Sequence, residues 1–404
     1  MLKLRFIQEI YLTQIEQCDY KRIKMFDYII IGAGYAGAVM AERIATQLDK
    51  KVLIIEKRNH IAGNCYDFKD ENNILVHKYG PHLFHTNNKK VIDYLSQFTE
   101  WDIYNHKVLA VIDGKKVPIP FNINTLYEVF PDSLAQTLEE KLLKAYPYNG
   151  KIPILELKES TDKDLQFLAD FVYEKIFVHY TAKQWDMKPE DMDGAVTARV
   201  PVFVGRDNRY FNDKYQVIPT NGYTKIFENM LDNKNIKLML NTDFNEVCKI
   251  TESSFEFMGS EFKGKAIYTG PIDELFDYKF GDLPYRGVDM RFETVDKEFY
   301  QEATTVNYPN NYDFTRITEF KHIHPTKSDK TTILKEYPNE YVKGKDIPYY
   351  PIFTDENQEK YNRYLEHSKK WINLILVGRL AEYKYYDMDD MVERALEVFE
   401  KEIR

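Results

Sequence analysis

The 404-residue chain contains little cysteine and no long hydrophobic run, and each absence excludes a class of protein. Its three cysteines, Cys18, Cys65 and Cys248, are too few for a disulfide framework and too scattered for a metal-binding cluster. This usage favours a reducing, cytoplasmic compartment. No apolar run approaches the ~20 residues of a membrane-spanning helix, so we expect no membrane insertion.

An excess of positive charge is also missing. The formal net charge is −9, which disfavours nucleic acid or an anionic membrane as a partner, so an anionic substrate would need locally placed arginines. Residues 1–24 carry charges throughout and lack the apolar core of a signal peptide. We interpret them as an N-terminal extension, with Met25 as a plausible natural start.

The stretch from Asp27 to Lys57 predicts a βαβ unit. Apolar runs at Tyr28–Ile31 and Val52–Ile55 have the composition of buried parallel strands, and a helical pattern lies between them. The turn after the first strand is Gly32-Ala33-Gly34-Tyr35-Ala36-Gly37, the dinucleotide fingerprint in its required context. A diphosphate would bind at the helix N-terminus, and Glu56 would accept hydrogen bonds from a ribose. The alternative is a glycine-rich turn used only for packing.

Two distant segments resemble parts of flavin-binding proteins with the glutathione-reductase-like fold. Ala62-Gly63 after the second strand allows close approach of backbone to a cofactor, as does the strand Ala266–Thr269, which ends at Gly270. A late buried strand, residues 374–377, ends in Gly378-Arg379 and precedes a C-terminal helix that begins near Met388. We therefore expect both ends of the chain to build one cofactor domain.

The remaining pattern predicts two further parts. Residues 107–121 form a hairpin that turns at Asp113-Gly114, and residues 284–340 alternate as an antiparallel sheet does. Helical periodicity at 133–146 and 162–180 predicts an inserted helical lobe. The expected divisions are an extension (1–24), a cofactor domain in three parts (25–104, 215–280 and 350–404), a sheet domain in two (105–121 and 281–349), a helical lobe (122–189) and a mobile connection (190–214).

Some candidates have a plainer alternative. His82 and His85 have a spacing that metal ligands use, but Gly80-Pro81 precedes them and nothing completes a site, so a loop against the cofactor is the better interpretation. Tyr180 and Trp185 either cap the core of the helical lobe or serve a ligand. The long connection around Arg199 is either a solvated loop or a lid, formed by residues 192–206, that closes over a bound ligand.

From Met25 onward the chain resembles the bacterial UDP-galactopyranose mutases, in the motifs DYIIIGAGYAGAV, HKYGPHLFHT, YTAKQW, ARVPVF, FTRITEFKH and GRLAEYKYYDMD. The resemblance implies an α/β fold: an FAD-binding, Rossmann-like domain with an inserted helical lobe and a twisted antiparallel sheet. It implies a cytoplasmic isomerase that forms a homodimer. The enzyme would interconvert UDP-galactopyranose and UDP-galactofuranose and supply galactofuranose for cell-surface glycans. The family uses reduced FAD and a covalent flavin N5–sugar adduct without net redox change, and it needs a reductant, here unidentified.

The same resemblance assigns residues to the substrate. Arg199 and Arg316 match the two phosphate-binding arginines, and Tyr180 matches the tyrosine that stacks on uracil. Ile176 replaces the family's second stacking aromatic. The other expected substrate contacts are Asn105, Trp185, Tyr210, Asn307, Tyr350 and Tyr385.

A second set faces the flavin. His82 would lie beside the isoalloxazine, Asp387 would place a carboxylate near the active site, and the helix dipole near Met388 would favour the flavin anion. We count His82, Arg199, Arg316 and Asp387 as catalytic candidates. The expected cofactor contacts are Gly32, Gly34, Tyr35, Ala36, Gly37, Glu56, Lys57, Gly63, Asn64, His82, Arg286, Gly378, Arg379, Tyr386, Asp387 and Met388. We expect no metal.

Two other functions share parts of this pattern. An amine-oxidase-type oxidoreductase has the same fingerprint and two-ended cofactor domain, but the arginines and tyrosines favour a diphosphate substrate. A flavin-free binder, such as the Rab GDP-dissociation inhibitors, has a related fold, but Glu56 and Gly378-Arg379 indicate an intact cofactor site.

Overall fold

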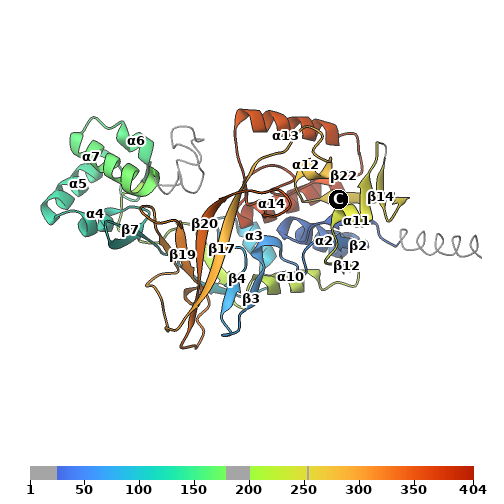
Figure 1. Cartoon of the computed structure of the whole chain (residues 1–404), viewed down its shortest axis with the longest axis horizontal. Helices are drawn as coiled ribbons and strands as arrows, with labels where there is room; N and C mark the ends of the chain where they lie inside the picture. Colours follow the sequence, from blue (N-terminus) through green and yellow to red (C-terminus); the bar gives the residue numbers. More distant parts are fainter. Residues whose placement is uncertain (1–24, 179–200, 253) are drawn as a thin grey trace, which may run out of the picture.

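The computed structural model describes residues 25–178, 201–252 and 254–404. The molecule is elongated (Figure 1), with a helical lobe at one end, an antiparallel sheet in the middle and an α/β domain at the other end. The predicted fold class is thereby confirmed. Tyr180, Trp185 and Arg199 lie outside the described residues, as does most of the expected lid.

The α/β domain is built on a five-stranded parallel sheet. Its core strands β1 (Tyr28–Ile31) and β2 (Val52–Ile55) have the predicted bounds and pair in register from Tyr28 opposite Val52. Both faces are covered, which is why these strands are apolar throughout. The sheet order is β12 (Ile236–Met239), β2, β1, β16 (Lys265–Tyr268), β22 (Leu374–Leu376).

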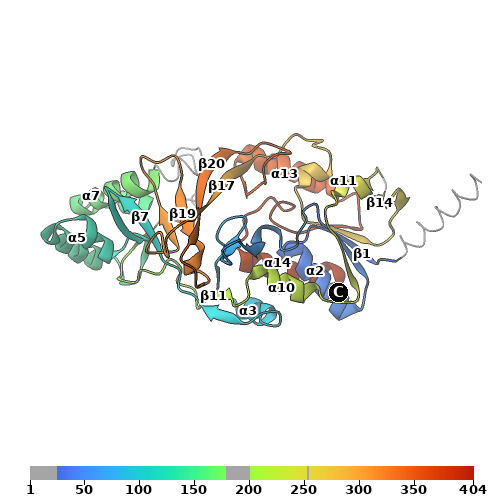
Figure 2. The ribbon, with the colours of Figure 1, turned by 60° about the horizontal axis from the view of Figure 1, so that its bottom comes forward.

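The helices divide between the two faces of this sheet. Ile30 of β1 contributes to a core with helices from distant parts of the chain, whereas Ile29 and Ile31 contribute to the core on the other face. Figures 1 and 2 show α2, α10 and α14 together on the first face. The first face carries α2 (Tyr35–Leu48), α3 (Lys89–Leu95), α10 (Tyr223–Leu231) and α14 (Met388–Val398); the second carries α11 (Phe244–Val247), α12 (Ile272–Leu275) and α13 (Asp355–Ser368).

The C-terminal segment completes the domain, as the sequence predicts. Strand β22 pairs with β16 at the sheet edge, and α14 packs along α2. Met391, Val392, Ala395 and Phe399 of the predicted inward face are buried, whereas Leu396 is only partly buried.

A seven-stranded sheet forms the middle of the molecule. The predicted hairpin is confirmed, with Asp113 and Gly114 both at positive φ in its turn. Strand β18 joins this hairpin to the long C-terminal strands by pairing parallel with β7. The order is β21 (Tyr350–Pro351), β17 (Tyr285–Val295), β20 (Thr331–Glu340), β19 (Arg316–Glu319), β18 (Thr305–Asn307), β7 (Val108–Ile112), β8 (Lys115–Ile119).

The helical lobe has its own core, made of residues from the hairpin and from the helices that follow it. The last helix ends in a π-helical segment, η2 (Tyr173–Val178), before the described residues stop. Residues 201–203, expected in a loop, form strand β10 against β9 (Lys151–Pro153). The helices are α4 (Ile123–Val129), α5 (Asp132–Ala145), α6 (Ile154–Lys158) and α7 (Lys163–Val172).

Three further small sheets were not predicted. Residues 255–257 form strand β14, which pairs with β13 (Cys248–Ile250) and β15 (Ser260–Glu261) outside the main sheet. Near the centre, β3 (Asp67–Lys69) pairs with β4 (Leu75–His77), and β11 (Tyr215–Pro219) lies between β5 (Phe84–Thr86) and β6 (Trp101–Ile103). The loop between β4 and β5 carries His82.

Candidate functional site

The glycine-rich turn packs too closely for any larger residue. Gly32 has φ +106°, and a Cβ there would lie 2.1 Å from Thr269 Oγ1. At Gly63, φ is +55° and a Cβ would lie 2.9 Å from the Gly34 Cα. Helix α2 starts immediately after Gly34, with no side-chain cap and no acidic residue in its first turn. Its free N–H groups therefore suit an anion such as a diphosphate.

Glu56 closes the turn from the other strand. Its Oε2 accepts a hydrogen bond from the Ala33 amide at 2.9 Å, and its Oε1 accepts one from the Arg58 amide at 2.9 Å. A carboxylate has about four acceptor positions, so capacity remains for two ribose hydroxyls. This position agrees with the role predicted for Glu56.

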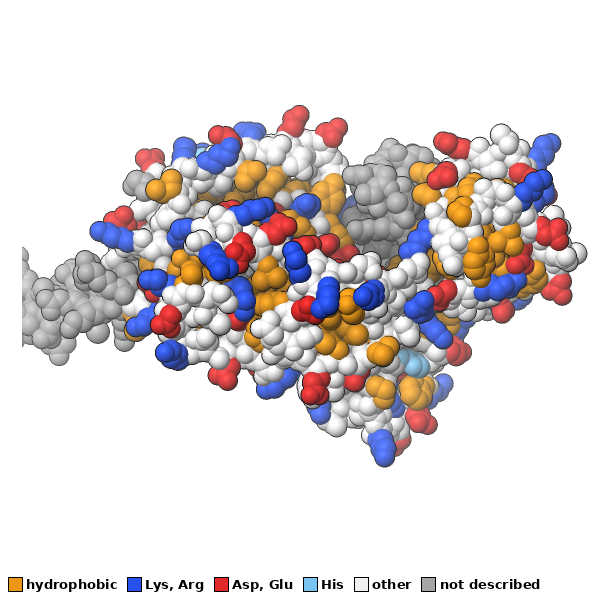
Figure 3. All heavy atoms as spheres, turned by 180° about the vertical axis from the view of Figure 1, so that it is seen from behind, with side chains coloured by type: hydrophobic (Ala, Val, Ile, Leu, Met, Phe, Trp, Pro, Cys, Tyr) orange, Lys and Arg blue, Asp and Glu red, His pale blue; other side chains and the backbone are white. Residues whose placement is uncertain are grey.

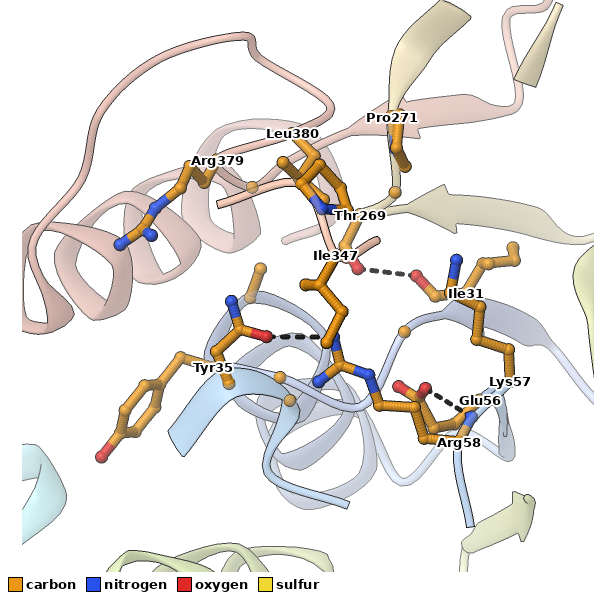
Figure 4. A pocket seen from close by; sticks show the side chains of 18 of the residues that line it. Ile31, Tyr35, Glu56, Lys57, Arg58, Thr269, Pro271, Ile347, Arg379 and Leu380 are labelled. Atoms are coloured by element: carbon orange, nitrogen blue, oxygen red, sulfur yellow. Dashed lines mark hydrogen bonds between the residues drawn. The ribbon is translucent and has the colours of Figure 1, made fainter. Parts of the chain in front are cut away.

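Arg58 lies beside Glu56 and the glycine-rich turn, and the sequence analysis did not predict it as a site residue. Its guanidinium donates from Nη2 to Asn64 Oδ1 at 3.0 Å and lies 4.5 Å from the ring centre of Tyr79. Its Nη1 is buried without a hydrogen-bond partner among the described residues. Figure 4 shows Arg58 and Glu56 on one wall of the hollow and Arg379 across from them. The only sequence signal was a second cation after Lys57.

The glycine-rich turn, Glu56 and Arg58 line a first cavity. Arg379 lies where this cavity meets a second one. Its guanidinium donates to the Tyr386 carbonyl at 2.7 Å and to the Tyr349 carbonyl at 3.3 Å. The stacked rings of Tyr350 and Tyr385 lie 5.6 and 5.3 Å from it. Arg379, His82, Asp387 and Met388 line both cavities. A ligand that fills the first cavity can therefore touch one in the second.

Most of the predicted cofactor residues line the first cavity. Gly37 does not, because it packs against the turn: a Cβ there would lie 2.0 Å from the Gly32 carbonyl oxygen. Arg286, on β17, lines neither cavity. The predicted residues that do line it are Gly32, Gly34, Tyr35, Ala36, Glu56, Lys57, Gly63, Asn64, His82, Gly378, Arg379, Tyr386, Asp387 and Met388.

The second cavity collects the predicted substrate residues that the structure describes, with one exception. Asn105 is exposed and lines neither cavity. Ile176 reaches the cavity wall from the helical lobe, and Asn307 Oδ1 is buried there without a partner among the described residues. The predicted residues in the wall are His82, Tyr210, Asn307, Arg316, Tyr350, Tyr385 and Asp387.

Arg316 is oriented by an acid that the sequence analysis did not single out. Glu336, on the neighbouring strand β20, accepts a hydrogen bond from Arg316 Nε at 2.7 Å. The Glu336 side chain is 5% exposed and that of Arg316 27%. A buried carboxylate held in this way fixes the guanidinium plane. In the same cavity, Tyr385 Oη donates to Asp387 Oδ1 at 2.9 Å.

Two histidines in the wall are neutral at pH 7. Burial, with Arg379 and Arg316 nearby, lowers the pKa of His82 to about 4. The His82 Nδ1 lies 2.9 Å from the Gly80 carbonyl oxygen, which can only accept, so Nδ1 carries the proton and Nε2 is an acceptor. Burial and Arg316 lower the pKa of His106 to about 3. His106 is a missed residue: it neighbours Asn105, and its Nδ1 is buried without a described partner.

The described residues offer neither a metal site nor a membrane-spanning helix. No three His, Cys, Asp or Glu side chains in the described ranges are arranged to hold a metal ion; His85 instead contacts Asp213 at 3.0 Å and stacks on Phe211. Among the described helices, none is both long and apolar enough to cross a bilayer. On the face shown in Figure 3, basic and acidic side chains are interspersed.

Comparison with known proteins agrees with this geometry. A family model described as UDP-galactopyranose mutase matches residues 175–385, and one described as an NAD(P)-binding Rossmann-like domain matches residues 30–98. The chain is 34% identical to a dTDP-fucopyranose mutase of Escherichia coli over 91% of this chain and 96% of that protein. It is 32% identical to a UDP-galactopyranose mutase of Mycoplasma pneumoniae over 94% and 96%.

Among solved structures, a crystal structure of reduced UDP-galactopyranose mutase superposes with a TM-score of 0.69. The match covers 93% of each chain at 15% sequence identity, so it bears on the fold alone.

Proposed function

The chain belongs to the UDP-galactopyranose mutase family, and from that premise we propose that it interconverts UDP-galactopyranose and UDP-galactofuranose. FAD is the cofactor of the first cavity. The observation that carries the proposal is the junction of the two cavities at His82, Arg379 and Asp387. An oxidoreductase of small amines has no need of the arginine and tyrosine wall that faces this junction.

The residues present fit FAD. The turn at Gly32 and Gly34 leaves backbone open for a diphosphate, Glu56 faces the ribose position, and Arg58 Nη1 is a buried donor that a phosphate oxygen would satisfy. When bound and reduced, FAD supplies the nucleophile for the anomeric carbon of the sugar. The protein therefore has to bind, orient and stabilise charge.

The arginine and tyrosine wall would stabilise the departing nucleoside diphosphate. Arg316, held by Glu336, brings a fixed positive charge to the place where negative charge grows as the glycosidic bond breaks. Tyr350 and Tyr385 line the same cavity beside Arg379. Family resemblance assigns the second phosphate arginine to Arg199, the uracil stack to Tyr180 and a sugar contact to Trp185.

His82 would act without charge. Its Nε2 is the unprotonated nitrogen of a neutral ring at the cavity junction, so it accepts a hydrogen bond, as from a sugar hydroxyl. His106 is likewise neutral and close to Arg316. Neither ring brings a positive charge that would compete with the arginines for the diphosphate.

The decisive experiment mixes dithionite-reduced holoprotein with UDP-galactofuranose and looks for UDP-galactopyranose by chromatography. We expect conversion with the reduced protein and little with the oxidised protein. A protein that purifies colourless and does not take up added FAD, or reduced holoprotein that leaves ring size unchanged, contradicts the proposal.

A second candidate substrate follows from the Escherichia coli relative, whose 34% identity to this chain exceeds the 32% identity of the Mycoplasma pneumoniae enzyme. dTDP-fucopyranose has a methyl group in place of the sugar's CH₂OH and a methylated base on a deoxyribose. Both substrates should be compared by kcat/KM on the same reduced preparation. Larger values for the dTDP-sugar would transfer the proposal to that substrate without altering the reaction type.

The proposal includes a cytoplasmic homodimer whose flavin receives electrons from a separate reductant. Cys65 and Cys248 are free and buried, which agrees with a reducing compartment. Light scattering during size-exclusion chromatography tests the dimer: a single peak at the mass of one chain would contradict it.

A further inference from the structure

A second histidine, His77, lies close to His82, and the centres of the two rings are 6.4 Å apart. His77, the last residue of β4, is completely buried. Its Nδ1 accepts a hydrogen bond from the backbone amide of His82 at 3.0 Å. Its Nε2 is buried without a partner among the described residues. A buried polar atom that lacks a partner is costly, so this histidine is retained at some cost to stability.

The bond fixes the protonation state of His77. An amide nitrogen can only donate, so Nδ1 must be bare and the proton of the neutral ring must be on Nε2. Burial lowers the pKa of His77 well below its usual value, with His324 and His82 adding to the effect. The groups around the ring are His82, His324, Tyr223 and Phe320, none of which is acidic.

The bond also controls the shape of the loop. Between His77 and His82 the chain passes through Gly80, whose φ is +85° and whose carbonyl oxygen accepts from the His82 ring. The Lys78 amide is held by the Tyr66 carbonyl at 3.0 Å. The loop is therefore held by backbone at one end and by the His77 imidazole at the other. Removing the imidazole frees the end that carries His82.

From these contacts we propose that His77 is a positioning residue: its Nδ1 anchors the His82 amide and so holds the His82 ring at the junction of the two cavities. The proposal deepens the function proposed above and rests on it for its effect on turnover, but the anchor itself is a property of the folded chain. His77 touches neither cavity, so its effect on a ligand passes through His82.

The test compares two substitutions of His77, one that removes the Nδ1 acceptor and one that replaces it. His77→Phe keeps the ring volume and removes the acceptor, whereas His77→Asn places an amide oxygen near the position of Nδ1. Hydrogen exchange of the His82 amide in the holoprotein reports the anchor directly. We expect exchange to rise about tenfold or more in His77→Phe, the loss of one buried hydrogen bond, and to return toward wild type in His77→Asn.

Turnover should follow the same order. With the reduced holoprotein we expect kcat to fall about tenfold or more in His77→Phe and to recover in His77→Asn, while KM and FAD content change less than about twofold. A merely structural role would instead lower the melting temperature of both variants and leave kcat of the folded fraction unchanged. His324→Gln is the matched control, since its ring lies 6.0 Å from that of His77 and no described hydrogen bond joins it to the loop.

The two proposals fail in different ways. If the wild type does not convert the sugar but His82 exchange responds to His77→Phe, the function is wrong and the anchor stands. If conversion occurs but neither exchange nor kcat responds, the anchor is wrong. Should His77→Phe not fold, nitrogen-15 histidine spectra of the wild type decide: a His77 that is protonated on Nδ1, or charged at pH 7, overturns the inference.

Discussion

At the scale of single residues, one arginine in the wall of the first cavity has a buried N–H group without a described partner. Arg58 is held by Asn64 and the Tyr79 ring, but its buried Nη1 has no described partner. We predict that Arg58→Met weakens FAD binding about tenfold to a hundredfold, because a charge-assisted hydrogen bond contributes about 1.5–3 kcal/mol. Titration of apoprotein with FAD measures this. Lys51→Met is the control, because Lys51 is exposed and lines neither cavity, and equal effects of both would contradict a specific role for Arg58.

A buried ion pair that lines neither cavity gives a pH prediction. Glu319 is fully buried and accepts from the Tyr300 and Gln301 amides and the Thr331 hydroxyl, and His322 Nε2 lies 3.3 Å from its Oε2. Burial alone would raise the pKa of Glu319, but the His322 contact and these hydrogen bonds lower it below 4.5. Although burial opposes it, the Glu319 contact raises the pKa of His322 above 6.5.

The directions of these two pKa shifts set the pH range in which the pair stabilises the fold. A lowered carboxylate pKa stabilises the fold above pH 4.5 and the gain is lost as pH falls; a raised histidine pKa stabilises it below pH 6.5 and the gain is lost as pH rises. We predict that Glu319→Gln costs about 3 kcal/mol between these values and less on either side. Thermal melts from pH 3.5 to 8.5 test this, with exposed Glu366→Gln as control. A difference independent of pH would contradict it.

At the scale of elements, helix α10 takes its N-terminal cap from a residue more than 150 positions earlier. The helix begins after Gly222, which offers no side chain, and Asp67 accepts from the Tyr223 amide at 2.6 Å and the Thr224 amide at 2.9 Å. We predict that Asp67→Ala lowers the free energy of unfolding by about 1–2 kcal/mol, as loss of a cap does. Asp67→Asn should retain part of this stabilisation, because its single amide oxygen can still accept from one of the two backbone amides. Urea denaturation measures both; equal losses would contradict capping.

This cap illustrates what sequence can and cannot predict. Strands 28–31 and 52–55 were predicted with their exact bounds because their apolar runs and the glycines between them are local signals. Helix α13 was missed because its buried side is Asn357, Tyr361, Tyr364 and Ser368, without an aliphatic stripe. Strand β14 has only three residues, and so short a segment carries no information on which sheet it joins.

The site residues also divide into those that local motifs predict and those that only the folded chain brings into place. Residues inside recognisable motifs, such as Arg316 and Arg379, were predicted and line the cavities. The sequence analysis missed Arg58, His106 and Glu336. The contacts that place them are with the Tyr79 ring, the Tyr210 ring and the Arg316 guanidinium, respectively, and none of these follows from local spacing. His77 lay in a quoted motif, but its bond to the His82 amide depends on the loop's path, which residue types alone do not encode.

At the scale of the whole molecule, the cofactor cavity joins segments from both ends of the chain. Most of its wall lies within residues 31–36, 55–65, 268–271 and 378–388, which belong to β1–α2, β2, β16 and the β22–α14 connection. Residues 242–244, 274, 347–348 and 391 complete it. The helical lobe shares no residue with this cavity. FAD should therefore stabilise the α/β domain as a unit, although its two halves are separated by more than 300 residues of sequence.

We predict that FAD at a hundred times its dissociation constant stabilises the native state by about 2.7 kcal/mol. Hydrogen exchange should slow together in residues 32–38 and 376–390, because a ligand that touches both segments must be released before either opens fully. Residues 132–145, in α5, should exchange at the same rate with and without FAD and serve as the internal control. Exchange mass spectrometry of apoprotein and holoprotein measures all three segments in one experiment. Protection confined to residues 32–38 would mean that the C-terminal segment packs on the domain without holding the cofactor.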